Sequence, residues 1–258
     1  MKKKDNYQLG TWVQMNSSTV IEIIGQSKFD FIVIDLEHGN ISLESLEQLL
    51  RAAECSGLKA IVRVYENNAS LIMRVLDLGP DGVLIPHVSS KKEAEKAVQF
   101  AKYPPIGTRG SCPCIREADH WSNNWPEFMK KSNNDTMVVA LVEGQDGIEN
   151  FGEIVEVDGI DAFMIGPFDL SVSLGIPGQT THPSIEETYS QVIEQTKKHG
   201  KELIGVDFSY DLQDIESSLG VWSNRGVSMI MTGIDKMFFT KIVQEVGELK
   251  ISKGGDGQ

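Results

Sequence analysis

The stretch of sequence that decides the fold reads Phe29-Asp30-Phe31-Ile32-Val33-Ile34-Asp35-Leu36-Glu37-His38-Gly39. Its apolar run, Phe31–Ile34, does not alternate with polar residues, which indicates a strand that is buried on both faces. The wall of a barrel, between an interior core and an outer layer of helices, requires such burial. An open sheet that is covered on both sides would give the same pattern.

Similar apolar runs alternate along the chain with longer amphipathic segments, a pattern typical of β-strand–α-helix units that build a parallel sheet. The amphipathic segments predict helices at Ser42–Ser56, Lys91–Ala101, Ser184–His199 and Asp235–Leu249. The apolar runs predict eight strands, at Gly10–Gln14, Phe31–Asp35, Ala60–Val64, Gly82–Pro86, Met137–Glu143, Asp161–Ile165, Glu202–Val206 and Val227–Thr232. Eight strands close a barrel, and 258 residues is the usual length for one. We therefore expect an α/β protein with a single domain over residues 1–258, a TIM (β/α)8 barrel.

One segment, at about 104–135, interrupts this rhythm with glycine, proline and tryptophan residues. It is too long for an ordinary connection, and long insertions in compact domains are usually lids, binding loops or disordered. We expect it to overhang the pocket as a lid, and its corner Gly107-Thr108-Arg109-Gly110 to approach the ligand. The glycine-rich tail, at about 252–258, is expected to fray.

The charge balance excludes several classes of partner. The chain has 24 Lys and Arg residues against 37 Asp and Glu residues, a formal net charge of −13, which repels a nucleic-acid backbone or an anionic membrane surface. No apolar run approaches the roughly 20 residues that span a bilayer. The start of the chain, Met1–Asp5, leads into polar residues rather than into a signal-peptide core. We therefore expect a cytoplasmic protein with no nucleic-acid and no membrane partner.

The three cysteines, Cys55, Cys112 and Cys114, are an odd number, which fits a reducing compartment better than a disulfide framework. Cys112 and Cys114 lie near His120 and could suggest a zinc site. A structural zinc site usually has four ligands, and a fourth at a familiar spacing is missing. Ordinary loop thiols are the better interpretation.

Charged residues stand where predicted strands end. The second strand is followed by Asp35 and His38, the third meets Arg63, the fifth ends at Glu143, and the sixth runs into Asp169. At a single strand, such a charge could simply mark the boundary with solvent. In a barrel, however, the C-terminal ends of all strands form one rim. Like charges at such short distances repel each other unless a cation or a substrate lies between them. The sequence therefore predicts an active site on this rim.

The carboxylates of Glu143 and Asp169 are the natural metal ligands, because hard oxygen donors suit Mg²⁺ or Mn²⁺. Two carboxylates leave positions open for the carboxylate and keto oxygens of a 2-keto acid, whose enolate the cation would stabilise as a Lewis acid. Arg63 would add positive charge at the same enolate oxygen. The alternative for Arg63 is a salt bridge that closes the barrel.

Two further features suggest roles in the reaction. His38 follows Asp35 by three residues, so a turn could bring the carboxylate to the imidazole and orient it as a general acid or base. A purely structural histidine would look the same. The segment Gly166-Pro167-Phe168-Asp169-Leu170-Ser171 predicts a tight turn that opens a short helix, whose backbone N–H groups near Phe168 and Asp169 could bind a carboxylate.

Three segments together resemble the signatures of the HpcH/HpaI aldolases, which are class II, metal-dependent pyruvate aldolases of the 4-hydroxy-2-oxoheptanedioate and 2-dehydro-3-deoxy-sugar-acid type. They are Phe29–Gly39, Pro104–Gly110 and Ile165–Ser171, in this order. The resemblance runs from about Leu9 to the last helix. This ordered combination is far more specific than any one of the segments.

The resemblance implies a (β/α)8 barrel and an aldolase that reversibly cleaves a 4-hydroxy-2-keto acid to pyruvate, or a similar 2-keto acid, and an aldehyde. It implies a divalent cation, Mg²⁺, Mn²⁺ or Co²⁺, at Glu143 and Asp169, enolate stabilisation by Arg63, and an acid/base pair of Asp35 and His38. It further implies a homohexamer that swaps the last helix between subunits. The substrate-binding residues that it implies are Trp12, Arg63, Gly166, Phe168 and Asp169.

The sequence departs from the family pattern at three places. Leu141 stands where many members have a Gln near the metal, and Tyr65-Glu66-Asn67-Asn68 stands where many have Pro-Trp-Asn-Asp. Leu141 removes a polar group that would support the metal. The stretch Cys112–Trp125 also departs, so the identity of the substrate is not carried over from the family.

Other functions compete with aldol cleavage. A condensing enzyme of the same family would use the same enolate with another carbonyl compound, as citrate-forming relatives do. A non-catalytic ligand-binding paralogue would be expected to lack one of the rim residues, which are all present. An acyl-CoA lyase would need a basic cluster for the CoA phosphates, and the sequence shows none.

Overall fold

The eight predicted strands form a closed parallel barrel in the computed structural model, which describes residues 7–251. Each strand pairs with the next one in the sequence, and β1 also pairs with β8. The strands are β1 (Gln8–Val13), β2 (Phe31–Asp35), β3 (Lys59–Arg63), β4 (Gly82–Ile85), β5 (Met137–Val142), β6 (Ala162–Ile165), β7 (Glu202–Asp207) and β8 (Met229–Ile234). The prediction of a TIM barrel is thereby confirmed. The polar start of the chain and the tail at about 252–258, which was expected to fray, lie outside the described residues.

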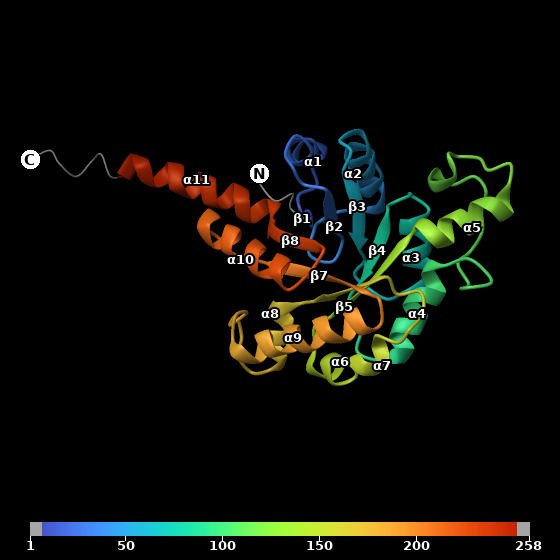
Figure 1. Cartoon of the computed structure of the whole chain (residues 1–258). Coiled ribbons are helices and arrows are strands. Elements are labelled where there is room, and N and C mark those ends of the chain that lie inside the picture. The colour runs from blue at the N-terminus through green and yellow to red at the C-terminus, as the bar shows by residue number, and fades with distance from the viewer. Residues whose placement is uncertain (1–6, 252–258) are drawn as a thin grey trace, which may run out of the picture.

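Helices alternate with the strands and surround the barrel (Figure 1). They are α1 (Ser18–Gly25), α2 (Leu43–Cys55), α3 (Ala69–Leu76), α4 (Lys91–Ala101), α5 (Trp125–Asp135), α6 (Gln145–Glu149), α7 (Phe151–Ile154), α8 (Pro167–Ser173), α9 (Pro183–Lys198), α10 (Leu212–Asn224) and α11 (Asp235–Ile251), with a 3-10 turn, η1 (Arg116–Ala118). The helix α2 shows how the sequence sets its ends: Ser42 accepts a hydrogen bond from the Ser45 N–H at 3.1 Å, which caps the first turn. None of these helices is long and apolar enough to cross a membrane.

Two hydrophobic cores result from the alternation of side chains along each strand. In β2, Phe31 and Val33 belong to the cluster inside the barrel, whereas Ile32 and Ile34 belong to the cluster between the strands and the helices. All four side chains are fully buried. The continuous apolar run therefore reflects a wall that is covered on both faces, as the sequence predicted.

The long insertion lies at the end of the barrel where strands begin, because it connects α4 to the start of β5. Its Glu117 N–H donates to the Asp77 carbonyl, and its Arg116 side chain donates to the Leu78 carbonyl; both acceptors precede β4. The active-site rim of such a barrel is at the other end. The expectation that this insertion overhangs the pocket is therefore wrong for a single chain.

The corner around Arg109 also differs from the expectation. The Arg109 side chain is buried, donates to Asp77 at 2.8 Å, pairs with Glu117, and lies 4.5 Å from the centre of the Tyr103 ring. These contacts hold the insertion against the barrel. The Gly107–Gly110 corner thus has a structural role here and does not approach the candidate site.

The last helix, α11, packs against β1 and β8 at its start and then extends away from the barrel (Figure 1). Four apolar side chains at helical spacing, Phe239, Ile242, Val243 and Val246, are between 51% and 64% exposed. A helix that points an apolar face into water is unusual in an isolated monomer, because burying that face against another chain is favourable.

Candidate active site

Three strands carry a charged rim residue two positions after their last apolar residue inside the barrel. Because side chains alternate, Asp35 follows Phe31 and Val33 on the inner face of β2, and Arg63 follows Ile61 on β3. Asp35 and Arg63 are direct partners in the register of these two neighbouring strands. In the same way, Glu143 follows Leu141 at the end of β5.

Asp35 and Arg63 form a bidentate ion pair in the interior of the rim. Arg63 donates from Nε to Asp35 Oδ1 at 2.8 Å and from Nη2 to Oδ2 at 2.7 Å. Gln14 donates to Oδ2, and the backbone N–H groups of Glu37 and His38 donate to Oδ1. Burial alone would raise the pKa of Asp35, but the bonds and the charge of Arg63, with Gln14 and the His38 N–H, hold that pKa below its ordinary value.

The ion pair continues into a chain of contacts that we call the polar arc, formed by Asp35, Arg63, Glu37, His87 and Glu143. Arg63 Nη1 lies 3.0 Å from Glu37 Oε2, and Glu37 Oε1 lies 3.1 Å from His87 Nε2. His87 Nδ1 lies 2.9 Å from Glu143 Oε1. The polar arc therefore joins the ends of β2, β3, β4 and β5 along the rim.

The predicted contact between the Asp35 carboxylate and the His38 imidazole does not form in the structure. His38 meets Asp35 through its backbone N–H, at 3.2 Å, and Arg63 and Gln14 occupy the carboxylate instead. The exposed His38 side chain nevertheless lines the candidate cavity. Its role as an acid or base stays a prediction, without Asp35 as a direct partner of the ring.

Glu143 and Asp169 form a pair of acids at the ends of β5 and β6. Burial raises the pKa of Glu143 to about 7; His87 opposes this shift, while the charges of Asp169 and Glu37 add to it. Gly166 lets the backbone approach this carboxylate, since a Cβ at this position would lie 2.8 Å from Glu143 Oε2.

These acids fit the oxygen-donor chemistry of a divalent cation, which would relieve their mutual repulsion. In the described part of the chain, no hydrogen bond or ion pair engages the exposed Asp169 carboxylate. No group of three or more His, Cys, Asp or Glu side chains within residues 7–251 is placed to hold a metal ion. A cation at Glu143 and Asp169 would therefore complete its coordination with water or substrate.

A cavity of about 170 Å³ is lined by the predicted site residues except Asp35, which is fully buried beneath Arg63. Its polar lining residues are Arg63, His38, Gln14, Glu143 and Asp169. Trp12 also lines it, with its ring centre 4.4 Å from the guanidinium carbon of Arg63. The remaining lining residues are largely apolar: Leu141, Met164, Ile165, Gly166, Pro167, Phe168, Val206, Phe208 and Ile234. Such a space suits a small anionic molecule with an apolar part.

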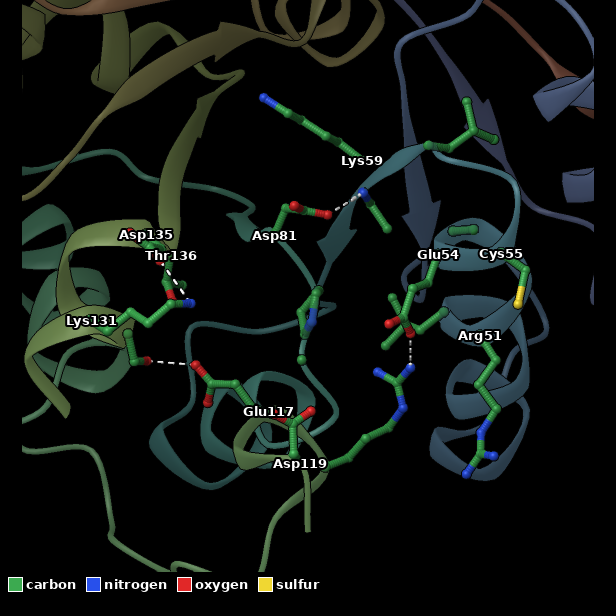
Figure 2. Close-up of a pocket in the computed structure, with 18 of the residues that line it drawn as sticks. Arg51, Glu54, Cys55, Lys59, Asp81, Glu117, Asp119, Lys131, Asp135 and Thr136 are labelled. Carbon is green, nitrogen blue, oxygen red and sulfur yellow. Dashed lines mark hydrogen bonds and ion pairs between the residues drawn. The ribbon is translucent and has the colours of Figure 1, made fainter. Parts of the chain in front are cut away.

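A larger cleft, of about 950 Å³, lies at the opposite end of the barrel between α2 and the insertion (Figure 2). Three of its acidic side chains, Glu54, Asp81 and Glu117, each accept a hydrogen bond there. Cys55, also part of its lining, is an exposed free thiol, as are Cys112 and Cys114 elsewhere in the chain. The rim differs from this cleft, because the ends of four neighbouring strands bring an arginine, a histidine and three acids into one chain of contacts.

Three residues of the rim were missed in the sequence: Gln14, Glu37 and His87. Glu37 lies within the stretch that decided the fold, and His87 follows Ile85 and Pro86 at the end of β4. The rule that strand ends carry the chemistry could have found His87. Its left-handed backbone, with φ of 55°, could not be read from the sequence.

Comparisons with known proteins concern the chain as a whole. A family model described as HpcH/HpaI aldolase/citrate lyase matches residues 8–240. The chain is 34% identical over 234 residues to 2-keto-3-deoxy-L-rhamnonate aldolase of Klebsiella pneumoniae subsp. pneumoniae, covering 91% of this chain and 85% of the relative. It is 35% identical over 200 residues to 2-dehydro-3,6-dideoxy-6-sulfogluconate aldolase of Pseudomonas putida, covering 78% of each chain.

Solved structures give the same result. An HpcH/HpaI aldolase from Desulfitobacterium hafniense DCB-2 superposes with a TM-score of 0.86 at 27% identity, covering 98% of this chain and 95% of the other. The citrate synthase SbnG superposes with a TM-score of 0.85 at 30% identity, covering 98% and 96%.

The buried ion pair leads to a stability prediction. The change Arg63→Met leaves the Asp35 carboxylate buried without a counter-charge, so the free energy of unfolding should fall by about 3–5 kcal/mol. Adding Asp35→Asn should recover part of this loss. Urea unfolding followed by circular dichroism measures both. The control is Arg51→Met, which breaks the exposed Arg51–Glu47 pair of α2 and should cost less than about 1 kcal/mol. Equal losses at the two positions would contradict the account.

Proposed function

Because the chain belongs to the HpcH/HpaI aldolase/citrate lyase family and is a carbon–carbon lyase of the aldolase class, we propose that it reversibly cleaves a 4-hydroxy-2-keto acid to pyruvate, or a similar 2-keto acid, and an aldehyde. Relatives named 2-keto-3-deoxy-L-rhamnonate aldolase and 2-dehydro-3,6-dideoxy-6-sulfogluconate aldolase support this substrate class. The small volume of the cavity, about 170 Å³, favours a short aldehyde.

The observation that supports the proposal most strongly is that one small cavity is lined both by the fixed guanidinium of Arg63 and by two carboxylates, those of Glu143 and Asp169. The Arg63 guanidinium is held by Asp35 and still lines the cavity, so its position does not depend on the substrate. Glu143 and Asp169 line the same cavity. A 2-keto acid that becomes an enolate needs positive charge at its oxygens, and a preorganised charge stabilises that state without rearrangement.

A divalent metal ion belongs to the chemistry of this family, and we assign its ligands here to Glu143 and Asp169. When bound, Mg²⁺, Mn²⁺ or Co²⁺ supplies a Lewis acid that polarises the keto oxygen. The donors that fit it are the buried carboxylate of Glu143 and the carboxylate of Asp169, which has no partner within residues 7–251. Leu141 contributes no polar group to this arrangement, although it lines the cavity.

In the proposed reaction, each of these residues has a separate role. His38, directly or through water, takes the proton of the C4 hydroxyl. The C3–C4 bond breaks, its electron pair forms the enolate of the keto acid, and the aldehyde leaves. Arg63 stabilises the enolate oxygen until C3 is protonated. The N–H groups of Phe168 and Asp169, in the first turn of α8 where helix N–H groups lack an acceptor within the helix, bind the substrate carboxylate beside Gly166. Trp12 lines the same cavity.

Condensation of the same enolate with another carbonyl compound is the second candidate. The superposition on the citrate synthase SbnG at 30% identity favours it specifically. Both reactions require the same rim, and they differ in the electrophile. Analysis of the products formed from pyruvate or another keto acid with aldehydes and with keto acids separates the two.

We also propose that the chain works as a homo-oligomer, a hexamer in the pattern of the family, in which α11 covers a neighbouring subunit. The support is the exposed apolar face formed by Phe239, Ile242, Val243 and Val246 on a helix that extends away from its own barrel (Figure 1).

The proposed activity predicts pyruvate release from 4-hydroxy-2-keto acids by the purified protein. EDTA should abolish the release, and Mg²⁺, Mn²⁺ or Co²⁺ should restore it. Glu143→Ala should lower it by at least about 100-fold, because the cation loses a ligand. Glu153→Ala, an exposed acid on α7, serves as the matched control and should leave the rate unchanged. No release with any metal, from folded protein that binds metal, would contradict aldol cleavage.

The close approach of Gly166 to Glu143 predicts that Gly166→Ala displaces this carboxylate, since the added Cβ would lie 2.7 Å from the Cβ of Glu143. Isothermal titration with Mn²⁺ should show an affinity lower by roughly 10-fold or more. Gly144→Ala is the control, because its added Cβ meets nothing within 4 Å. Unchanged Mn²⁺ affinity in Gly166→Ala would remove Glu143 from the metal site.

The apolar face of α11 predicts that Val243→Lys combined with Val246→Lys lowers the assembly state. Light scattering after size exclusion should show the wild type at several times its chain mass of 28.5 kDa and the double variant at a smaller mass. Glu248→Lys changes charge elsewhere on the same helix and should leave the assembly intact. A monomeric wild type would overturn the proposal.

A further inference from the structure

His87 occupies an unusual place between two acids of the rim. Its Nδ1 lies 2.9 Å and its backbone N 3.0 Å from the same oxygen, Oε1 of Glu143, while Nε2 lies 3.1 Å from Glu37. The residue follows β4, between the strand that carries Arg63 and the strand that leads to Glu143. Its imidazole thus joins the two halves of the polar arc.

The backbone of His87 makes this double contact possible. Its φ of 55° lies in the left-handed region, which residues other than glycine seldom adopt. This conformation turns both the N–H group and the ring toward one carboxylate oxygen. Non-glycine residues held in this region often mark functional sites, where surrounding contacts stabilise an unfavourable backbone.

Glu143 depends on His87 for its orientation. In the part of the chain that the structure describes, the only hydrogen-bond and ion-pair partners of the Glu143 carboxylate are the N–H group and the ring of His87. The carboxylate is 5% exposed, so water has little access to replace them. The opposite side of the carboxylate lies against Gly166.

The contact contributes little to the packing of the core. The His87 side chain is 66% exposed and does not line the cavity. Removal of the His87 side chain therefore leaves no buried cavity, and its effect on the stability of the fold should be small. The imidazole of His87 instead orients the buried carboxylate of Glu143 and connects it, through Glu37, to Arg63.

We propose that His87 is a positioning residue that orients the Glu143 carboxylate for the divalent cation and couples it, through Glu37, to Arg63. This proposal rests on the proposed function, because it assumes that Glu143 holds the metal. His87 does not touch the substrate, so its loss should act on metal affinity first. A group that orients a metal ligand typically changes metal affinity by about 10- to 100-fold when it is removed.

Two near-isosteric substitutions separate the two contacts of the ring. In His87→Asn, the amide nitrogen falls near the position of Nδ1 and can still reach Glu143. In His87→Gln, it falls near the position of Nε2 and favours Glu37. His87→Ala removes both contacts. His120→Ala is the matched control, since His120 also has a left-handed backbone, with φ of 66°, but lies in the insertion at the other end of the barrel.

The test measures Mn²⁺ dissociation constants of the purified full-length variants by electron paramagnetic resonance in the absence of substrate, with circular dichroism to establish folding. We expect His87→Ala and His87→Gln to weaken Mn²⁺ binding by roughly 10-fold or more, and His87→Asn to recover most of the affinity. His120→Ala should bind Mn²⁺ like the wild type.

The outcomes distinguish this proposal from the proposed function. Loss of Mn²⁺ binding in Glu143→Ala with unchanged binding in His87→Ala would overturn the role of His87 and leave the metal site in place. Unchanged binding in Glu143→Ala would overturn the metal assignment itself. Recovery by His87→Gln instead of His87→Asn would also contradict the proposal, because the contact of Nδ1 with Glu143 would then not be the one that orients this carboxylate.

Discussion

The buried ion pair of Asp35 and Arg63 is the interaction on which the rest of the rim depends. Removing both charges from water is costly, and the pair persists because its geometry is bidentate and Gln14 and two backbone N–H groups satisfy the remaining lone pairs of Asp35. Arg63 is thereby fixed with its face against Trp12 and its third nitrogen toward Glu37. The position of the positive charge is set before any ligand arrives.

The sequence predicted the barrel and the charged rim because two local signals agreed. The unbroken apolar run of β2 required burial on both faces, and the same run ended in charge. Inward-facing residues alternate along each strand, so Asp35, Arg63 and Glu143 had to lie above the barrel interior once the strands were correctly placed. The family and its aldolase chemistry, implied by three motifs, are confirmed by the comparisons.

The errors came from features that depend on tertiary arrangement. The insertion was expected over the pocket, but a connection that leads from α4 into β5 must lie where strands begin. Asp35 was expected to hold the His38 ring, and spacing along the chain could not show that Arg63, on the neighbouring strand, takes both carboxylate oxygens. His87 stands just after β4, where the strand-end rule could have found it, but its contacts join residues distant in the sequence and its left-handed backbone has no signature at this position.

In the proposed function, Arg63 and a divalent cation, which Glu143 and Asp169 would hold, together stabilise the enolate of a 2-keto acid. It is tested most directly without any aldehyde, by following the exchange of pyruvate methyl protons for deuterium in D2O by mass spectrometry. The account predicts exchange that requires both the enzyme and a divalent cation and that disappears in Asp169→Ala. Exchange that survives chelation of the metal, or no exchange by folded and metal-loaded enzyme, would contradict it.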